Sequence, residues 1–317
     1  MHTTSNFCQE TVRKRSGLRT QMAALASVVF ILSAICAPVL PAIGEGIIEA
    51  YGLQISESET YLQLTNVNVQ NLEEFMAVLD RLPGLAQVDM YESKLKRAQI
   101  EELAEKYPGI RFGWTLPIGD HKVRTDTTAF STLHNNKSKE HTSRDFELLK
   151  YCWQLEALDI GHNKVKDLEF LRNFPNLKVL ILACDQVDNI DALASLTQLE
   201  YLELFKNNIT DISALAGMEN LLDLNICFNR LAGEEAYAPL MELKSLRRLW
   251  LYNSNNYSSS SPVNAKWVAN IKEALPDCHV DAVSYSTQGG WREHSRYDTI
   301  FKVFKTSVYE PFTYFGQ

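Results

Sequence analysis

Apolar residues recur at a fixed interval through the middle of the chain. Leu155, Leu177, Leu199 and Leu221 lie 22 positions apart and each begins the pattern Leu-x-x-Leu-x-Ile/Leu, which Leu246 begins again after 25 positions. A unit this short, with one strand and one return segment, cannot bury its apolar edge alone. The repeat therefore predicts parallel strands that stack into a solenoid around a shared apolar core.

A small polar residue follows each strand pattern. It lies three positions after the last apolar residue, at Asn163, Asp185, Asn207, Asn229 and Ser254. We expect its side chain to turn inward and to bond backbone groups at a tight corner, where they would otherwise be unpaired. Asp185 departs from the pattern, because a carboxylate donates no hydrogen bond unless it is protonated. The sequence thus predicts one corner bond that is missing or bridged by water.

The pattern over residues 152–254 resembles the leucine-rich repeat family, in the short 22-residue form of the internalin-like bacterial surface proteins. The resemblance implies an α/β leucine-rich repeat solenoid. Such a solenoid has a curved parallel β-sheet on its concave face, helical or irregular returns on its convex face, and capping segments at its ends. Residues 124–131 and 289–294 also resemble segments of exported leucine-rich repeat proteins of Firmicutes bacteria.

Residues 45–145 read as longer, irregular relatives of the repeats that cap the solenoid. Helical spacing predicts helices over 71–82 and 98–107, each stopped by a Pro-Gly pair. Extended segments on both sides of a Gly-Asp-His turn predict a hairpin within 113–125.

The regular repeats occupy residues 146–254. Residues 255–317 predict one more degenerate repeat, with a helix at 267–275 and a strand at 279–283, followed by a C-terminal cap rich in aromatic residues.

The N-terminus has the layout of an export signal. Residues 1–21 form a basic n-region, and residues 22–43 form an uncharged, largely apolar run. This run is long enough to span a bilayer, so a cleaved signal peptide, an uncleaved signal-anchor and a buried helix are all open. The first two place the rest of the chain outside the cytoplasm, either secreted or at the cell envelope. We expect contact with a membrane only through residues 22–43, if they are uncleaved.

Composition narrows the class of protein. With 317 residues, 45% hydrophobic and 22% charged, the chain is an ordinary globular protein and not a disordered one. A net charge of −8 makes a nucleic-acid partner a poor candidate. Six cysteines are too few for a dense disulfide scaffold.

Non-leucine positions of the strands define a candidate binding surface, because side chains alternate along a strand and these point away from the leucine core. Toward the C-terminal end they form an aromatic cluster with charged neighbours, the composition of interface hot spots. The candidate binding residues are Tyr201, Glu203, Phe205, Asp223, Asn225, Phe228, Arg248, Trp250 and Tyr252. The alternative is that the insert at 233–238 or the tail aromatics cover these rings. On the open-surface hypothesis, Arg248 and Trp250 can be changed without loss of the fold.

Catalytic and metal-binding patterns are weak. None of the seven histidines shows a metal-ligand spacing, and His134 and His141 share a loop without a cysteine or carboxylate at ligand spacing. We therefore expect no metal, no cofactor and no catalytic residues. An enzyme would need a pocket in the non-repeat segments where side chains such as His121, Arg124, Asp126 or His294 converge.

The sequence favours an exported, non-catalytic leucine-rich repeat protein that recognises a protein or peptide through its concave face. A glycan ligand is a less favoured variant of the same hypothesis. A cytoplasmic leucine-rich repeat scaffold or regulator is the main alternative, and an enzyme with its site outside the repeats is a further one.

Overall fold

The computed structural model describes residues 46–133, 140–255, 262–284 and 290–311. The predicted leader at 22–43 lies outside this part of the chain. Among the described residues, no helix combines the length and apolar character needed to cross a membrane.

The first described segments form a hairpin and a small parallel sheet. Strands β3, β4 and β5 pair in parallel, with helices α1 and α2 in the connections between them. Both helices lie within two or three residues of their predicted bounds. Asn71 caps α1, because its side chain accepts hydrogen bonds from the N–H groups of Glu73 and Glu74. The elements are β1 (Ile47–Ala50), β2 (Leu53–Ser56), β3 (Tyr61–Gln63), α1 (Leu72–Leu79), β4 (Gln87–Asp89), α2 (Arg97–Lys106), β5 (Arg111–Gly113) and the hairpin β6 (Thr115–Ile118) and β7 (His121–Arg124).

A seven-stranded parallel sheet follows, in which every strand pairs with its neighbours in the sequence. Equivalent leucines are in register from strand to strand, as in Leu180 with Leu158 and Leu202. The strands are β8 (Ala129–Ser131), β9 (Ala157–Asp159), β10 (Val179–Ile181), β11 (Tyr201–Glu203), β12 (Asp223–Asn225), β13 (Arg248–Trp250) and β14 (His279–Asp281). The leucine-rich repeat solenoid predicted from the 22-residue period is confirmed. Strand β8 was not predicted, because it lacks the leucine pattern.

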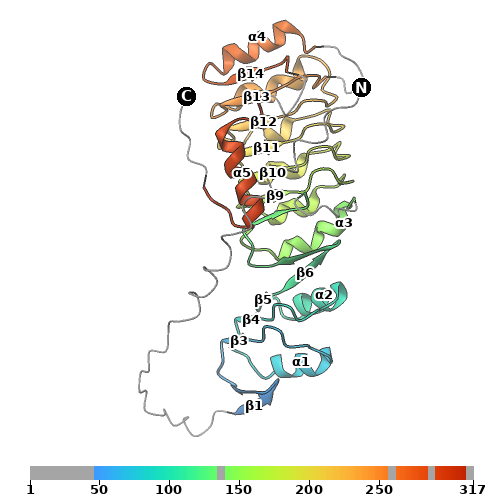
Figure 1. The fold of residues 1–317 in the computed structure, drawn as a ribbon, viewed down its shortest axis with the longest axis vertical. Coiled ribbons are helices and arrows are strands. Elements are labelled where there is room, and N and C mark those ends of the chain that lie inside the picture. Colours follow the sequence, from blue (N-terminus) through green and yellow to red (C-terminus); the bar gives the residue numbers. More distant parts are fainter. Residues whose placement is uncertain (1–45, 134–139, 256–261, 285–289, 312–317) are drawn as a thin grey trace, which may run out of the picture. The chain divides into compact units, whose positions relative to one another are not determined.

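Short helices form the returns between these strands. Most are 3₁₀ turns, and the longest of these, η5, contains residues 235–238 of the insert of the fourth unit. The returns are α3 (Ser143–Phe146), η1 (Glu147–Tyr151), η2 (Glu169–Asn173), η3 (Asp191–Ser195), η4 (Ser213–Leu215), η5 (Glu235–Glu242) and α4 (Ala265–Ala274). A last helix, α5 (Ser295–Thr306), runs alongside the stacked strands, on the side away from α1, α2 and α3 (Figure 1).

The repeat leucines form a continuous apolar core between the sheet and the returns, which we call the leucine core. Leu158, Leu180, Leu202, Leu224 and Leu249 are all fully buried in it. The insert of the fourth unit also belongs here, because Tyr237 is buried and packs against Trp267 in α4.

The polar corners behave as the sequence predicts. The amide of Asn207 accepts a hydrogen bond from the N–H of Val187 and donates to the carbonyls of Leu182 and Leu204. Asp185 accepts from the N–H groups of Asn163 and Val165, but its buried Oδ2 has no hydrogen bond. The corner at Asp185 therefore lacks the donor bonds that Asn207 makes, and a bridging water at this corner stays a prediction.

Candidate functional site

The concave face of the seven-stranded sheet is covered by the C-terminal end of the described chain. We call residues 290–309 the C-terminal strap; it comprises Trp291, helix α5 and the residues just after the helix. On α5, Ile300, Val303 and Phe304 are buried against the strands. The strap and the strand residues it covers form a second apolar cluster, the concave core. Its buried members are Ala129, Ala157, Val179, Ile181, Ala183, Tyr201, Cys227, Trp250, Trp291, Ile300, Val303, Phe304 and Tyr309.

Trp291 is the centre of this contact and is fully buried. Its ring centroid lies 5.4 Å from that of Tyr201 and 5.9 Å from that of Trp250. The guanidinium of Arg248 stacks over the same ring at 4.4 Å. The indole N–H donates to Glu203 Oε2 at 3.1 Å. The ring is therefore buried against apolar neighbours while its one polar group is hydrogen-bonded.

Beneath the strap, a carboxylate of the sheet forms ion pairs with one cation of the sheet and one cation of the strap. Asp223 Oδ1 accepts from Arg248 Nε at 2.7 Å, and its Oδ2 lies 3.0 Å from Arg296 Nη1 on α5. All three side chains are buried. Such charges are tolerated in a low dielectric only when they are paired. The strap therefore supplies the second of two cations that surround one carboxylate.

Glu203 is the second buried acid of this region. Burial raises its pKa, while Arg292 and the hydrogen bonds from Trp291 and Tyr201 oppose that rise. Its Oε2 accepts from the Tyr201 hydroxyl at 3.0 Å. The carboxyl group is thus held by one partner from the sheet and by others from the strap.

The far end of the strap is tied to the loop before β8. The Ser307 carbonyl accepts from Thr127 Oγ1 at 3.1 Å, and the Tyr309 N–H donates to Thr128 Oγ1 at 2.7 Å. These bonds anchor the strap at the β8 end of the sheet, while Trp291 anchors it at the β13 end.

The structure gathers all nine candidate binding residues on the concave side of the sheet, but most are not open to a partner. Tyr201, Glu203, Asp223, Asn225, Arg248 and Trp250 are buried, and Phe205, Phe228 and Tyr252 are half-buried. Of the two coverings considered from the sequence, the tail is the one observed, and the insert at 233–238 packs elsewhere. Arg248 and Trp250 lie outside the leucine core, as expected, but both are buried in contact with Trp291 of the strap.

The three half-buried rings form a row that we call the aromatic ladder. The rings of Phe205 and Phe228 meet edge to face with centroids 5.4 Å apart, and those of Phe228 and Tyr252 do the same at 5.4 Å. They pack against the concave core on one side. Phe228 has a left-handed backbone (φ 56°), as do Lys206, Cys184 and His162 at the same position of earlier units. The ladder is the part of the predicted site that keeps accessible aromatic surface.

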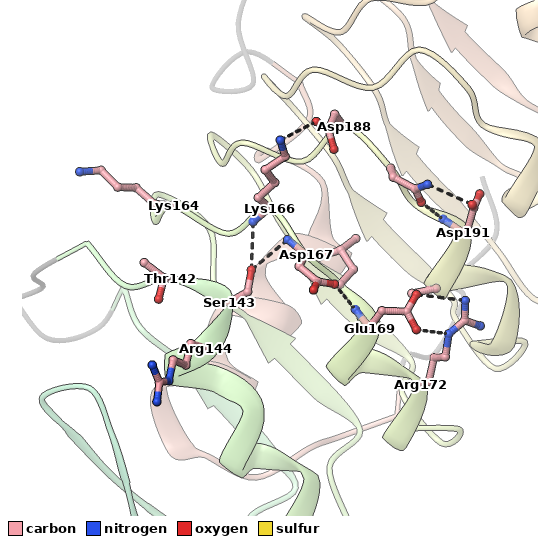
Figure 2. Close-up of a pocket in the computed structure, with 13 residues that line it drawn as sticks. Thr142, Ser143, Arg144, Lys164, Lys166, Asp167, Glu169, Arg172, Asp188 and Asp191 are labelled. Carbon is pink, nitrogen blue, oxygen red and sulfur yellow. Dashed lines mark hydrogen bonds and ion pairs between the residues drawn. The ribbon is translucent and has the colours of Figure 1, made fainter.

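A pocket on the return side is lined mainly by charged residues, four of which form two ion pairs within it. Figure 2 shows Lys166 directed at Asp188, and Arg172 bonded to Glu169. The hydroxyl of Ser143 accepts hydrogen bonds from the N–H groups of Lys166 and Asp167. These contacts engage Lys166, Asp188, Arg172 and Glu169 in pairs and use the Ser143 hydroxyl to cap the backbone of the return.

The four residues proposed for an enzyme site do not converge. Arg124 forms a two-pronged ion pair with Asp126 and stacks on Tyr91 at 3.6 Å. His294 accepts from the N–H of Arg296 at the start of α5. His121 lies instead beside Asp120 and His141, a grouping that was not predicted from the sequence.

Comparison with known protein families agrees with this fold. The family model described as "Leucine Rich repeats (2 copies)" matches residues 153–195. No curated protein matches the chain. An internalin (InlF) from Listeria monocytogenes is 19% identical, with a TM-score of 0.41 over 73% of this chain and 56% of that one, so the match spans little more than half of that internalin. Internalin C2 from the same organism is 20% identical, with a TM-score of 0.35 over 73% of this chain and 87% of that one.

A plant protein gives a shorter match. The ectodomain of the receptor kinase SOBIR1 from Arabidopsis thaliana is 19% identical, with a TM-score of 0.32 over 43% of this chain and 70% of that one. The family match and the seven-stranded parallel sheet with its short returns together identify this chain as one that carries leucine-rich repeats and folds as a leucine-rich repeat solenoid.

Proposed function

We propose that this chain is an exported, non-catalytic repeat protein that binds a protein or peptide partner at the aromatic ladder. The observation that carries the proposal is the ladder itself, three rings in edge contact that keep part of their surface accessible. Clustered aromatic side chains supply a large contact area at low cost in side-chain entropy, which is why they dominate interface hot spots.

The strap supports the same function in a second way. Helix α5 presents an apolar face to the concave side of the sheet, so this surface already holds one amphipathic helix. Grooves that bind helices recognise apolar anchors at helical spacing. A partner then binds beside the strap, on the ladder, and the strap forms one wall of the contact.

The binding proposal is tested with the full chain and two variants. Phe228→Ser combined with Tyr252→Ser removes two rings of the ladder, whereas Arg172→Ala changes the return side only. The three proteins are screened against purified envelope and extracellular proteins. We expect a partner that the wild type and Arg172→Ala bind alike and that the ladder variant binds at least about tenfold more weakly.

A partner that binds the ladder variant as tightly as the wild type would place the contact on another surface. Near-ultraviolet circular dichroism of the ladder variant provides the control for folding, because these rings also pack on the concave core. Binding of glycans alone, with no protein retained, would replace the protein partner by a carbohydrate one.

Export rests on residues 22–43 and is tested separately. The chain is expressed in a bacterial host, fractionated, and sequenced from its N-terminus. A start within residues 37–43 in the medium, or an intact chain in the membrane fraction, is expected. An intact chain in the cytosol would favour the intracellular scaffold instead.

A further inference from the structure

Three potential metal ligands meet at the tip of the β6–β7 hairpin. Asp120 lies in the turn, His121 begins β7, and His141 comes from the segment that leads into α3. The two histidines are buried, and the carboxylate is partly exposed. The group thus joins the hairpin to the entry of the regular repeats.

The distances suit a small tetrahedral ion. Asp120 Oδ1 lies 2.9 Å from His141 Nε2 and 3.4 Å from His121 Nε2, and the three ligand atoms lie within 4.8 Å of one another. Zinc–nitrogen and zinc–oxygen bonds of about 2.0–2.2 Å at tetrahedral angles separate ligand atoms by about 3.3–3.5 Å. The Asp120–His121 spacing matches this geometry, and side-chain rotation would bring the His141 nitrogen to the same spacing.

The surroundings hold the two imidazoles in place. The His121 ring meets Phe130 edge to face at 5.5 Å, and the His141 ring meets Phe146 at 6.0 Å. The backbone N–H of His141 donates to Asn163 at 2.8 Å, so the first polar corner of the repeats fixes this ligand. Ligands on packed side chains and regular elements form a more precise site than ligands on free loops.

Gly119 makes room for this arrangement. Its backbone is left-handed (φ 57°), and a Cβ at this position would overlap the His141 imidazole. The turn therefore brings the hairpin backbone directly against the His141 ring. A glycine is needed both for the backbone conformation and for the close approach.

The buried Nε2 of His141 faces the carboxylate of Asp120. It lies 2.9 Å from Asp120 Oδ1, but without the geometry of a hydrogen bond. An unsatisfied buried nitrogen costs free energy, and coordination to a cation would satisfy it. The partly exposed carboxylate leaves the remaining coordination position accessible to water.

We propose that Asp120, His121 and His141 bind one divalent transition-metal ion, Zn²⁺ before others, as a clamp between the β6–β7 hairpin and the first regular repeat. Two imidazoles and one carboxylate suit zinc and disfavour magnesium and calcium, which prefer all-oxygen sites. Along the chain, the clamp lies between the three-stranded sheet and most of the seven-stranded sheet. This inference is independent of the proposed partner binding, because it concerns a different part of the chain.

The experiment is titration of chelator-treated full chain with Zn²⁺, followed by calorimetry and by the thermal unfolding midpoint. One ion is expected to bind per chain and to raise the midpoint, and excess Mg²⁺ or Ca²⁺ should not displace it. Titration with Co²⁺ should give the visible absorption of a tetrahedral site.

Variants locate the site. Asp120→Asn changes the most exposed ligand and should keep the fold, and His141→Gln removes a buried one; each should weaken zinc binding at least about tenfold. Asp188→Asn, a matched change on the return side, should bind zinc as the wild type does. Absence of zinc binding by the wild type would overturn the proposal. So would stoichiometric binding that Asp120→Asn and His141→Gln leave unchanged, since it would place the ion elsewhere.

Discussion

The leucine core and the concave core differ in composition and in how far apart in the sequence their contacting residues lie. The leucine core is apolar throughout, and each of its layers comes from residues a few positions apart in one unit. The concave core mixes aromatic rings with buried charges, and it joins strands to residues far along the chain, as in the bond between Trp291 and Glu203. The leucine core continues from one repeat to the next, whereas the concave core forms only when the strap is docked.

This difference assigns the two cores different roles in stability. The leucine core holds neighbouring repeats together and so determines whether the solenoid is folded. The concave core holds the strap on a sheet that already has its own core. Loss of the strap should therefore expose one face of the sheet without unfolding the repeats.

The largest effects are expected from one large apolar side chain in each core. Leu202→Ala should lower the free energy of unfolding of the solenoid by about 2–5 kcal/mol, and Trp291→Ala should weaken docking of the strap by about 3–5 kcal/mol. Denaturation followed by far-ultraviolet circular dichroism should show an earlier main transition for Leu202→Ala. For Trp291→Ala, limited proteolysis should show a more easily cleaved strap. If Trp291→Ala unfolded the repeats together with the strap, the two cores would be one cooperative unit.

The buried ion pairs give the next largest effect. Asp223→Asn leaves Arg248 and Arg296 facing each other without a carboxylate, and removal of one partner from a buried pair costs about 3 kcal/mol or more. Asp188→Asn breaks the exposed pair with Lys166 and should cost less than about 1 kcal/mol. Chemical denaturation of both variants measures the contrast. Equal losses would mean that the charges beneath the strap are hydrated and the face is open.

The smallest effect concerns the polar corner at Asp185. Burial raises the pKa of Asp185 to about 7, whereas an unfolded aspartate titrates near 4. Between these values the folded chain binds more protons than the unfolded chain, so the stability contributed by this group falls as the pH rises from about 4 to about 7. Asp159, buried under the strap, has its pKa raised to about 7 for the same reason and adds to the slope.

Asp185→Asn should remove part of that slope and stabilise the chain by about 1 kcal/mol at pH 8, because the amide can donate at the corner as Asn207 does. The reverse change, Asn207→Asp, should lower the free energy of unfolding of the chain, and this loss should grow as the pH rises from about 4 to about 7. Unfolding curves at several pH values measure both. An unchanged slope for Asp185→Asn would show that this carboxyl is not the buried group responsible.

The leucine core and the concave core also differ in how far the sequence predicts them. The leucine pattern predicted the stacked strands, the polar corners and the defect at Asp185, because those contacts are local and periodic. Strand β8 was missed because Phe130 and Thr132 stand where the next unit has Leu158 and Ile160. The position of the strap depends on contacts with β8 to β13, which no local pattern encodes.

The candidate site was predicted in part for the same reason. Alternation along each strand placed nine side chains on one face, but it could not decide whether that face was open. Asp223 and Arg248 carry charges that suggest a surface, and the ion pairs that Asp223 forms with Arg248 and with Arg296 explain how these charges are buried. A binding role for these residues stays a prediction, and the aromatic ladder is the part that remains accessible for it. The grouping of Asp120 with His141 was missed because a chain segment of twenty residues separates them.

The central claim is that the chain's own strap is docked on the concave face. Hydrogen–deuterium exchange of the full chain, read out over residues 295–306, tests it most directly. In the wild type these amides should exchange slowly, and in Trp291→Ala they should exchange fast while those of β9 to β13 stay protected. Fast exchange of residues 295–306 in the wild type would mean that the strap is not docked and that the concave face is open, which would contradict the account.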